Sequence, residues 1–156
     1  MIIYRILSFI VNMFCAFLAI ITLFGLLFAL ANPAALWKSF LMAGIVLYGW
    51  FANRFYVYVV IGKQKISQKQ KDWLQVNAIV ALVASALGIK ESIYIFYHPY
   101  VFDDILKDMP AQNLPSQNLV LNVAAILLAV CFILLIHIIW TYILIKKNKT
   151  YITEEE

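Results

Sequence analysis

Charged residues are scarce in this chain of 156 residues. Asp, Glu, Lys and Arg make up 13% of it and hydrophobic residues 65%, whereas a soluble domain has about 25% charged and about 45–50% apolar residues. A chain this short cannot bury so many apolar side chains in one soluble core, and a chain this hydrophobic is not disordered. The composition therefore excludes a soluble enzyme, a nucleic-acid-binding protein and a secreted disulfide scaffold, and it predicts an integral membrane protein.

Cysteine, histidine and glycine are also sparse, with two, two and five copies. Cys15 and Cys131 both fall inside apolar runs and lack a C-x-x-C partner, so we expect buried packing residues. The scattered glycines form no phosphate loop, and neither H-E-x-x-H nor G-x-S-x-G occurs. His98 and His137 are expected near opposite membrane faces, which excludes an axial haem pair. We therefore expect no catalytic residue, metal ligand or cofactor, although an enzymatic role stays open.

Long hydrophobic runs, by contrast, occupy most of the chain. Four of them cover residues 6–30, 39–61, 73–97 and 119–145, and each exceeds the roughly 20 residues that a helix needs to cross a bilayer. None shows the alternating pattern of a transmembrane β-strand. We therefore expect an all-α fold in which residues 1–156 form one domain, a bundle of four transmembrane helices.

Helix-capping signals lie at the ends of these runs. Asn32-Pro33 has the pattern of an N-cap followed by a first-turn proline, which makes the link between the first two helices very short. Ser67 with Gln70 fits a capping box before the third helix, and Ser116 is a candidate cap for the fourth.

The longest connection, residues 98–117, has apolar and charged residues on opposite faces at helical spacing. This pattern predicts a short amphipathic helix on the outer membrane surface. The apolar residues are Val101, Phe102, Ile105, Leu106 and Met109, and the charged ones are Asp103, Asp104, Lys107 and Asp108. The aspartates lack the glycine and the ligand spacing of a calcium loop, so we expect a solvated face.

Basic residues are distributed unequally between the two sides of the expected bundle. Of the twelve, Arg54 and Lys90 fall inside the runs, eight lie on one side, and only Lys38 and Lys107 lie on the other. The eight are Arg5, Lys63, Lys65, Lys69, Lys71, Lys146, Lys147 and Lys149. The positive-inside rule then predicts a multi-pass protein of the cell's inner membrane with both termini in the cytoplasm.

An alternative for the N-terminal run is a cleaved signal peptide. Arg5, the apolar run and the small residues of Ala29-Leu30-Ala31 have the required order. The run is, however, much longer than the 7–15 apolar residues of an ordinary signal peptide. We expect it to be retained as the first helix.

Polar side chains recur in the cytoplasmic third of the expected helices. The candidates for a polar cluster are Asn12, Asn53, Arg54, Asn77 and His137. Intramembrane polar groups are costly and often functional, so they predict a pocket for an anionic headgroup or a small ligand. The competing interpretation is that the asparagines and His137 form interhelical hydrogen bonds.

Arg54 differs from the other candidates in the direction in which it points from the axis of the second helix. It lies about 160° from the centre of the small-residue stripe formed by Gly49, Ala52, Asn53 and Tyr56. If that stripe faces the bundle, Arg54 faces lipid headgroups or another protein.

Glu91, near the outer end of the third helix, is the candidate for ion or proton transport. Its alternatives are a local interaction with Lys38 or Tyr48, or solvation at the membrane interface.

With little sign of catalytic chemistry, we expect a non-catalytic accessory or assembly subunit of a larger membrane complex. Its partners would be the lipid bilayer and a second membrane protein or another copy of itself. Two alternatives remain. One is a small-solute or ion transporter that uses Glu91 and the inner polar cluster. The other is a lipid- or quinone-binding protein or enzyme that uses the aromatic second helix.

Overall fold

The protein forms four long helices, as the apolar runs predict. The computed structural model describes residues 2–30, 33–100 and 116–153. The helices are α1 (Ile2–Ala29), α2 (Pro33–Phe55), α3 (Gln68–Tyr97) and α5 (Gln117–Lys147). Each is long and apolar enough to cross a membrane. The all-α, four-span prediction is confirmed, and the chain is a small membrane protein.

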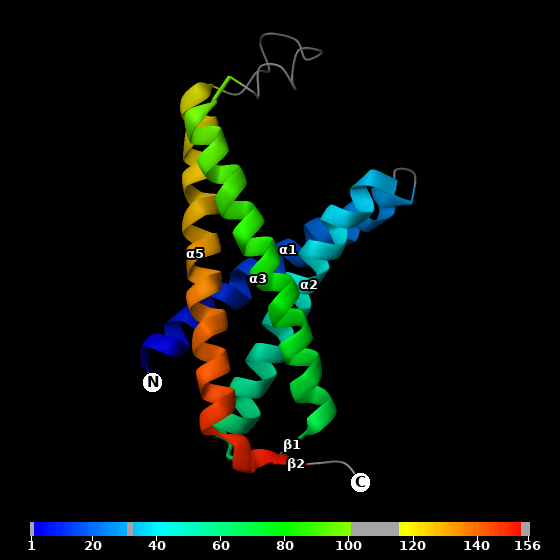
Figure 1. Cartoon of the computed structure of the whole chain (residues 1–156), viewed down its shortest axis with the longest axis vertical. Coiled ribbons are helices and arrows are strands. Elements are labelled where there is room, and N and C mark those ends of the chain that lie inside the picture. The colour runs from blue at the N-terminus through cyan, green and yellow to red at the C-terminus, as the bar shows by residue number, and fades with distance from the viewer. Residues whose placement is uncertain (1, 31–32, 101–115, 154–156) are drawn as a thin grey trace.

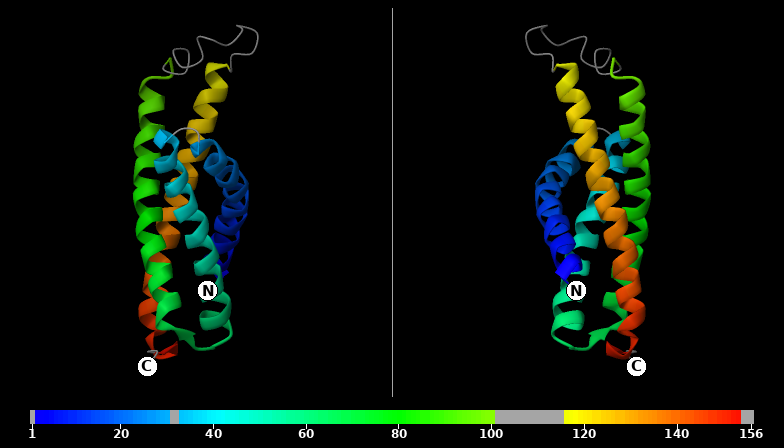
Figure 2. Two further views of the ribbon diagram at one scale, coloured as in Figure 1. Left: turned by 90° about the vertical axis from the view of Figure 1, so that its right-hand side faces the viewer. Right: turned by 90° about the vertical axis from the view of Figure 1, so that its left-hand side faces the viewer.

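The helices pair as two antiparallel hairpins that cross each other (Figure 1). Helix α2 packs against both α1 and α3, α3 packs against α5, and the contact between α1 and α5 is less extensive. The α1–α2 hairpin lies against one side of the α3–α5 hairpin (Figure 2). The hairpins diverge toward the end that holds Pro33 and Tyr97, which opens the bundle there.

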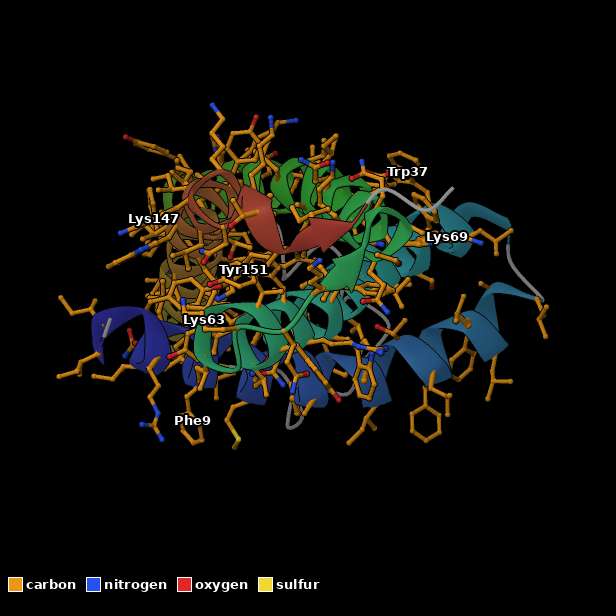
Figure 3. All side chains as sticks on the ribbon, turned by 90° about the horizontal axis from the view of Figure 1, so that it is seen from below. Phe9, Trp37, Lys63, Lys69, Lys147 and Tyr151 are labelled. Atoms are coloured by element: carbon orange, nitrogen blue, oxygen red, sulfur yellow. The ribbon has the colours of Figure 1, made fainter. Side chains whose placement is uncertain are left out.

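The opposite end is closed by segments that the apolar runs do not predict. A π-helical segment, η1 (Tyr56–Ile61), continues α2. The short strand β1 (Ile66–Ser67) then pairs in parallel with β2 (Ile152–Thr153), which follows the 3-10 turn η3 (Lys149–Tyr151). Seen from this end, Lys63 lies beside Tyr151 (Figure 3), with its ammonium 5.6 Å from the ring centre. These contacts join the α2–α3 link to the segment after α5.

Two of the predicted caps are present. The Ser67 side chain accepts a hydrogen bond from the Gln70 amide at 3.3 Å, and Ser116 accepts one from the Leu119 amide at 3.3 Å. Helix α2 begins at Pro33 as expected, while Asn32 and the amphipathic helix predicted within residues 98–117 lie outside the described residues, apart from that segment's two ends.

Small residues allow the helices of each hairpin to approach closely. A Cβ atom at Gly88 of α3 would lie 2.6 Å from the sulfur of Cys131 on α5, and Gly49 of α2 meets Cys15 of α1 in the same way. Both cysteines are free and buried. They lie where a larger side chain would push the helices apart.

Candidate functional site

A buried polar network joins three of the four helices, α1, α2 and α5. Tyr4 and Ser8 come from α1, Tyr48 from α2, and His137 and Thr141 from α5. All five side chains are buried. The Tyr48 hydroxyl lies 2.7 Å from His137 Nδ1 and 3.1 Å from Thr141 Oγ1. The Ser8 hydroxyl lies 3.0 Å from His137 Nε2, and the Tyr4 hydroxyl 2.9 Å from Thr141 Oγ1.

One arrangement of protons satisfies every contact in this network. Thr141 donates to the carbonyl of His137 at 2.8 Å, so its oxygen can accept from both tyrosines. The Tyr48 oxygen then accepts from Nδ1–H of His137, and Nε2 accepts from Ser8. In the described part of the chain, no buried side-chain nitrogen or oxygen lacks a partner. Every hydrogen-bond donor of the network is therefore used within the network.

The network also fixes the position of α1 against α5. The Tyr4 ring stacks on His137, with ring centres 5.0 Å apart and planes 15° apart, and it contacts Tyr56 and Trp140 at 5.0 and 5.9 Å. Because lipid is as apolar as the helices themselves, such hydrogen bonds and close packing hold transmembrane helices together. The arrangement is that of an interhelical clamp.

Sequence reasoning missed three members of this clamp. Tyr4 precedes the predicted first span, Tyr48 is expected only among the aromatic residues of the second helix or as a neighbour of Glu91, and Thr141 carries no prediction. A signal was present nonetheless. Tyr4 and Ser8 are four residues apart, as are His137 and Thr141, so each pair shares a helix face.

The five predicted polar residues do not meet in one pocket. His137 belongs to the clamp, and Asn77 is buried but donates to the Trp73 carbonyl of its own helix at 2.8 Å. Asn12 is half-buried, and Asn53 and Arg54 are exposed. The placement of Asn53 in a bundle-facing stripe is wrong, because Tyr48, Ala52 and Phe55 form the buried face of α2 and leave Asn53 outside it.

Arg54 lies in a shallow depression on the exposed face of α2 and η1. The depression has a volume of about 360 Å³ and is lined by Trp50, Asn53, Arg54, Val57 and Tyr58. The guanidinium group lies 5.5 Å from the centre of the Tyr58 ring, a cation–π contact. Arg54 makes no ion pair with any of the residues that the structure describes. We call these five residues the Arg54 surface.

Glu91 lines a different cavity, the cleft between the two hairpins. The cleft has a volume of about 460 Å³ and receives side chains from all four helices. Its walls are mainly apolar, for example Leu18, Leu41 and Leu134, with Lys38 and Glu91 as its charged members. None of the five inner polar candidates lines it. The cleft and the clamp are therefore separate features.

Metal-ligating side chains do not gather within residues 2–30, 33–100 and 116–153, where no three His, Cys, Asp or Glu residues come together. Comparisons with other proteins add no further assignment: the chain matches no protein-family model, and no curated protein or solved structure is detectably similar to it.

Proposed function

We propose that this small membrane protein is a non-catalytic accessory subunit that docks to a partner membrane protein through the Arg54 surface. The observation that carries the proposal is an exposed arginine, without an ion pair among the described residues, that lies beside exposed aromatic residues inside a membrane-spanning segment. Trp50 is 69% exposed and Tyr58 45% exposed. Tryptophan, tyrosine and arginine are the residues most enriched in binding hot spots.

Arg54 lies well inside the membrane-spanning segment. It precedes Ile61, the last residue of the membrane-spanning segment, by seven residues, or roughly 10 Å. A charge at this depth is costly unless it reaches a headgroup or meets an opposite charge. A partner helix with a carboxylate at the same depth would neutralise Arg54 while covering Trp50 and Tyr58.

The clamp supports a non-catalytic role. Tyr4, Tyr48 and His137 are hydrogen-bonded within the network, and none of the three lines the cleft or the Arg54 surface. What the protein offers to other molecules is therefore its outer surface.

The proposal is tested with a photo-crosslinking amino acid placed at Trp50, and in a separate protein at Phe40, an exposed residue near the other end of α2. We expect the Trp50 probe to capture one defined membrane protein in native membranes and the Phe40 probe not to capture it. Arg54→Leu should weaken co-purification of that protein about thirtyfold, as loss of a hot spot of about 2 kcal/mol would do.

Arg5→Leu is the matched control, because Arg5 is also exposed but lies on α1. It should leave co-purification unchanged. Equal capture from Trp50 and Phe40, or equal losses in the two arginine variants, would contradict docking through the Arg54 surface. Thermal melting of each purified variant verifies that the bundle is intact.

The cleft favours a second candidate, transport of a small solute or ion past Glu91, because it receives side chains from all four helices and holds two charged residues. Glu91→Gln should then abolish coupled flux into liposomes, with Glu91→Asp retaining part of it. If the unaltered protein shows no flux of protons, sodium or potassium, this candidate loses its support.

A further inference from the structure

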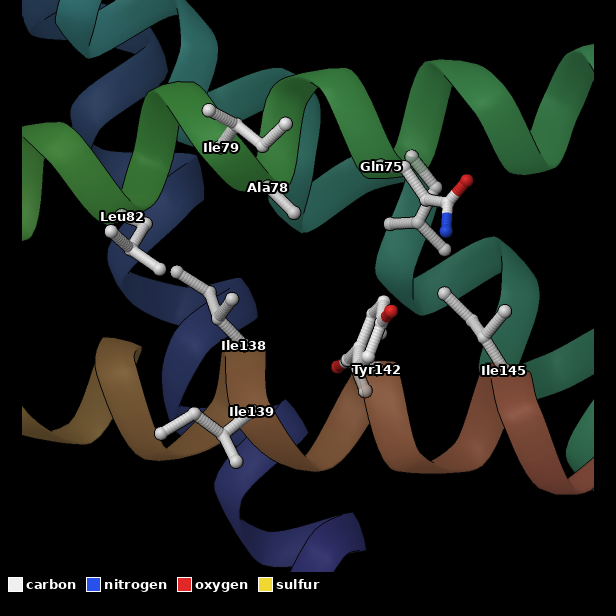
Figure 4. Close-up of a pocket in the computed structure, with 10 residues that line it drawn as sticks. Gln75, Ala78, Ile79, Leu82, Ile138, Ile139, Tyr142 and Ile145 are labelled. Carbon is white, nitrogen blue, oxygen red and sulfur yellow. The ribbon is translucent and has the colours of Figure 1, made fainter.

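An open groove runs between α3 and α5 on a face that the Arg54 surface does not include. The groove has a volume of about 480 Å³ and apolar walls, with Ala78, Ile79 and Leu82 on α3 facing Ile138 and Ile139 on α5 (Figure 4). Its polar members are Gln75, Tyr142 and Thr141 of the clamp, and Gln75 and Tyr142 face each other toward one end. We call this the α3–α5 groove.

The groove results from the way the two helices diverge. They approach closely where Gly88 meets Cys131, and they separate toward the lysine-rich end (Figure 1). The small side chain of Ala78 leaves the space between them unfilled. From Leu74 to Leu82 the groove extends eight residues along α3, or about 12 Å. This is a large part of one leaflet of a hydrocarbon layer about 30 Å thick.

A basic pocket continues the groove at its polar end. This pocket, of about 710 Å³, shares Gln75, Tyr142 and Ile145 with the groove. Its other lining residues include Lys71, Lys146 and Lys149. We call it the lysine pocket.

Within residues 2–30, 33–100 and 116–153, only one lysine of the pocket forms an ion pair. Lys71 pairs with Asp72 at 3.5 Å, but Asp72 does not line the pocket. The Lys146 ammonium lies 5.1 Å from the Tyr142 ring centre, so it is held at the junction between the pocket and the groove. Lys149 follows the end of α5 in η3. Three ammonium groups thus border one polar cavity at the end of the helices.

We propose that the α3–α5 groove and the lysine pocket together bind one anionic glycerophospholipid. The phosphate-bearing headgroup occupies the lysine pocket, and an acyl chain lies in the groove against Ala78 and Leu82. The site combines an apolar surface with a cluster of positive charges. An apolar channel at hydrocarbon depth selects a chain, and a cluster of lysines at its interfacial end selects a negative charge. The site includes no residue of the Arg54 surface. Evidence for or against lipid binding here is therefore independent of the proposed docking function.

The test is native mass spectrometry of the full chain, purified in detergent and titrated with lipids of identical acyl chains. In detergent the surface potential of a bilayer is absent, so general attraction of lysines to a charged membrane does not contribute. We expect phosphatidylglycerol to bind at a ratio of one per chain and phosphatidylcholine to bind at least tenfold more weakly. Glycerol phosphate, which has the charge without the chains, should not bind detectably.

Two kinds of variant measure separately how much the lysine pocket and the groove contribute to lipid binding. The triple change Lys71→Gln, Lys146→Gln and Lys149→Gln should weaken phosphatidylglycerol binding about a hundredfold, at about fivefold for each lysine. Ala78→Leu fills the groove without altering charge and should weaken binding of both lipids. Ile79→Trp narrows the groove from an exposed position, so the test remains decisive even if Ala78→Leu impairs folding.

The matched control changes three lysines at the same end that do not line the pocket, Lys65, Lys69 and Lys147, to glutamine. Binding should change less than threefold. If this control loses as much binding as the pocket variant, the interaction is general charge attraction and the proposal is wrong. Equal binding of phosphatidylcholine, or equally tight binding of glycerol phosphate, would overturn it as well. Capture of a transmembrane peptide in place of lipid would identify the groove as a protein interface instead.

Discussion

Removing the Tyr48 hydroxyl should weaken the clamp between α2 and α5. Tyr48→Phe keeps the ring in place but deletes contacts of 2.7 Å to His137 and 3.1 Å to Thr141. Thr141 keeps its contacts to Tyr4 and to the His137 carbonyl, whereas Nδ1 of His137 is left unpaired. The change therefore separates the loss of hydrogen bonds from any loss of packing.

The expected cost follows from these two losses. Interhelical hydrogen bonds in membrane proteins contribute about 0.6 kcal/mol each on average and up to about 1.7 kcal/mol. A buried polar atom without a partner adds about 1–3 kcal/mol. We expect Tyr48→Phe to lower the free energy of unfolding by about 1–3 kcal/mol.

The assay is reversible unfolding in mixed micelles, followed by circular dichroism. Tyr58→Phe is the matched control, because Tyr58 is a tyrosine ten residues further along that is 45% exposed. It should change the free energy of unfolding by less than about 0.5 kcal/mol. A double-mutant cycle of Tyr48→Phe with His137→Phe should give a coupling energy of about 0.6–1.7 kcal/mol. A coupling near zero, or equal effects of the two tyrosine changes, would refute the role of the clamp.

Two further predictions concern packing and orientation. Gly88→Ala should destabilise the protein by about 1–3 kcal/mol because the new methyl group meets the sulfur of Cys131, and Cys131→Ala in the same chain should restore much of the loss. Differential scanning fluorimetry of the single and double variants measures both, and an unchanged Tm for Gly88→Ala would contradict the close approach. A C-terminal green fluorescent protein should fluoresce and a C-terminal alkaline phosphatase should be inactive, as the lysine bias predicts. An active phosphatase would show that the orientation is wrong.

Several features of the fold could be predicted because their causes are local. A run of apolar residues is long enough to span a bilayer whatever its neighbours do, so all four helices were predictable from composition and length. The caps at Ser67 and Ser116 depend only on residues within one turn, and both are present. The helices extend beyond the predicted runs because polar residues such as Gln68 can continue a helix past the hydrocarbon layer.

The candidate sites were predictable only in part. His137 was identified as a polar intramembrane residue, but its partners Ser8 and Tyr48 lie 129 and 89 positions away in the chain. The pairing of Ile66 with Ile152 was not foreseen either, because a two-residue strand has no periodicity to detect.

The sequence by itself determined the four membrane spans, their caps and the concentration of lysines at one end, since hydrophobicity, capping and charge are properties of short segments. Only the tertiary structure decided how the two hairpins cross, which polar residues meet in the clamp, and that α3 and α5 diverge to leave a groove beside three lysines. The physical reason is that the free energy of contact with lipid is nearly the same for every apolar face of a helix. The crossing of helices in a membrane is therefore set by small residues and a few hydrogen bonds between distant segments, and these act only once the helices have met.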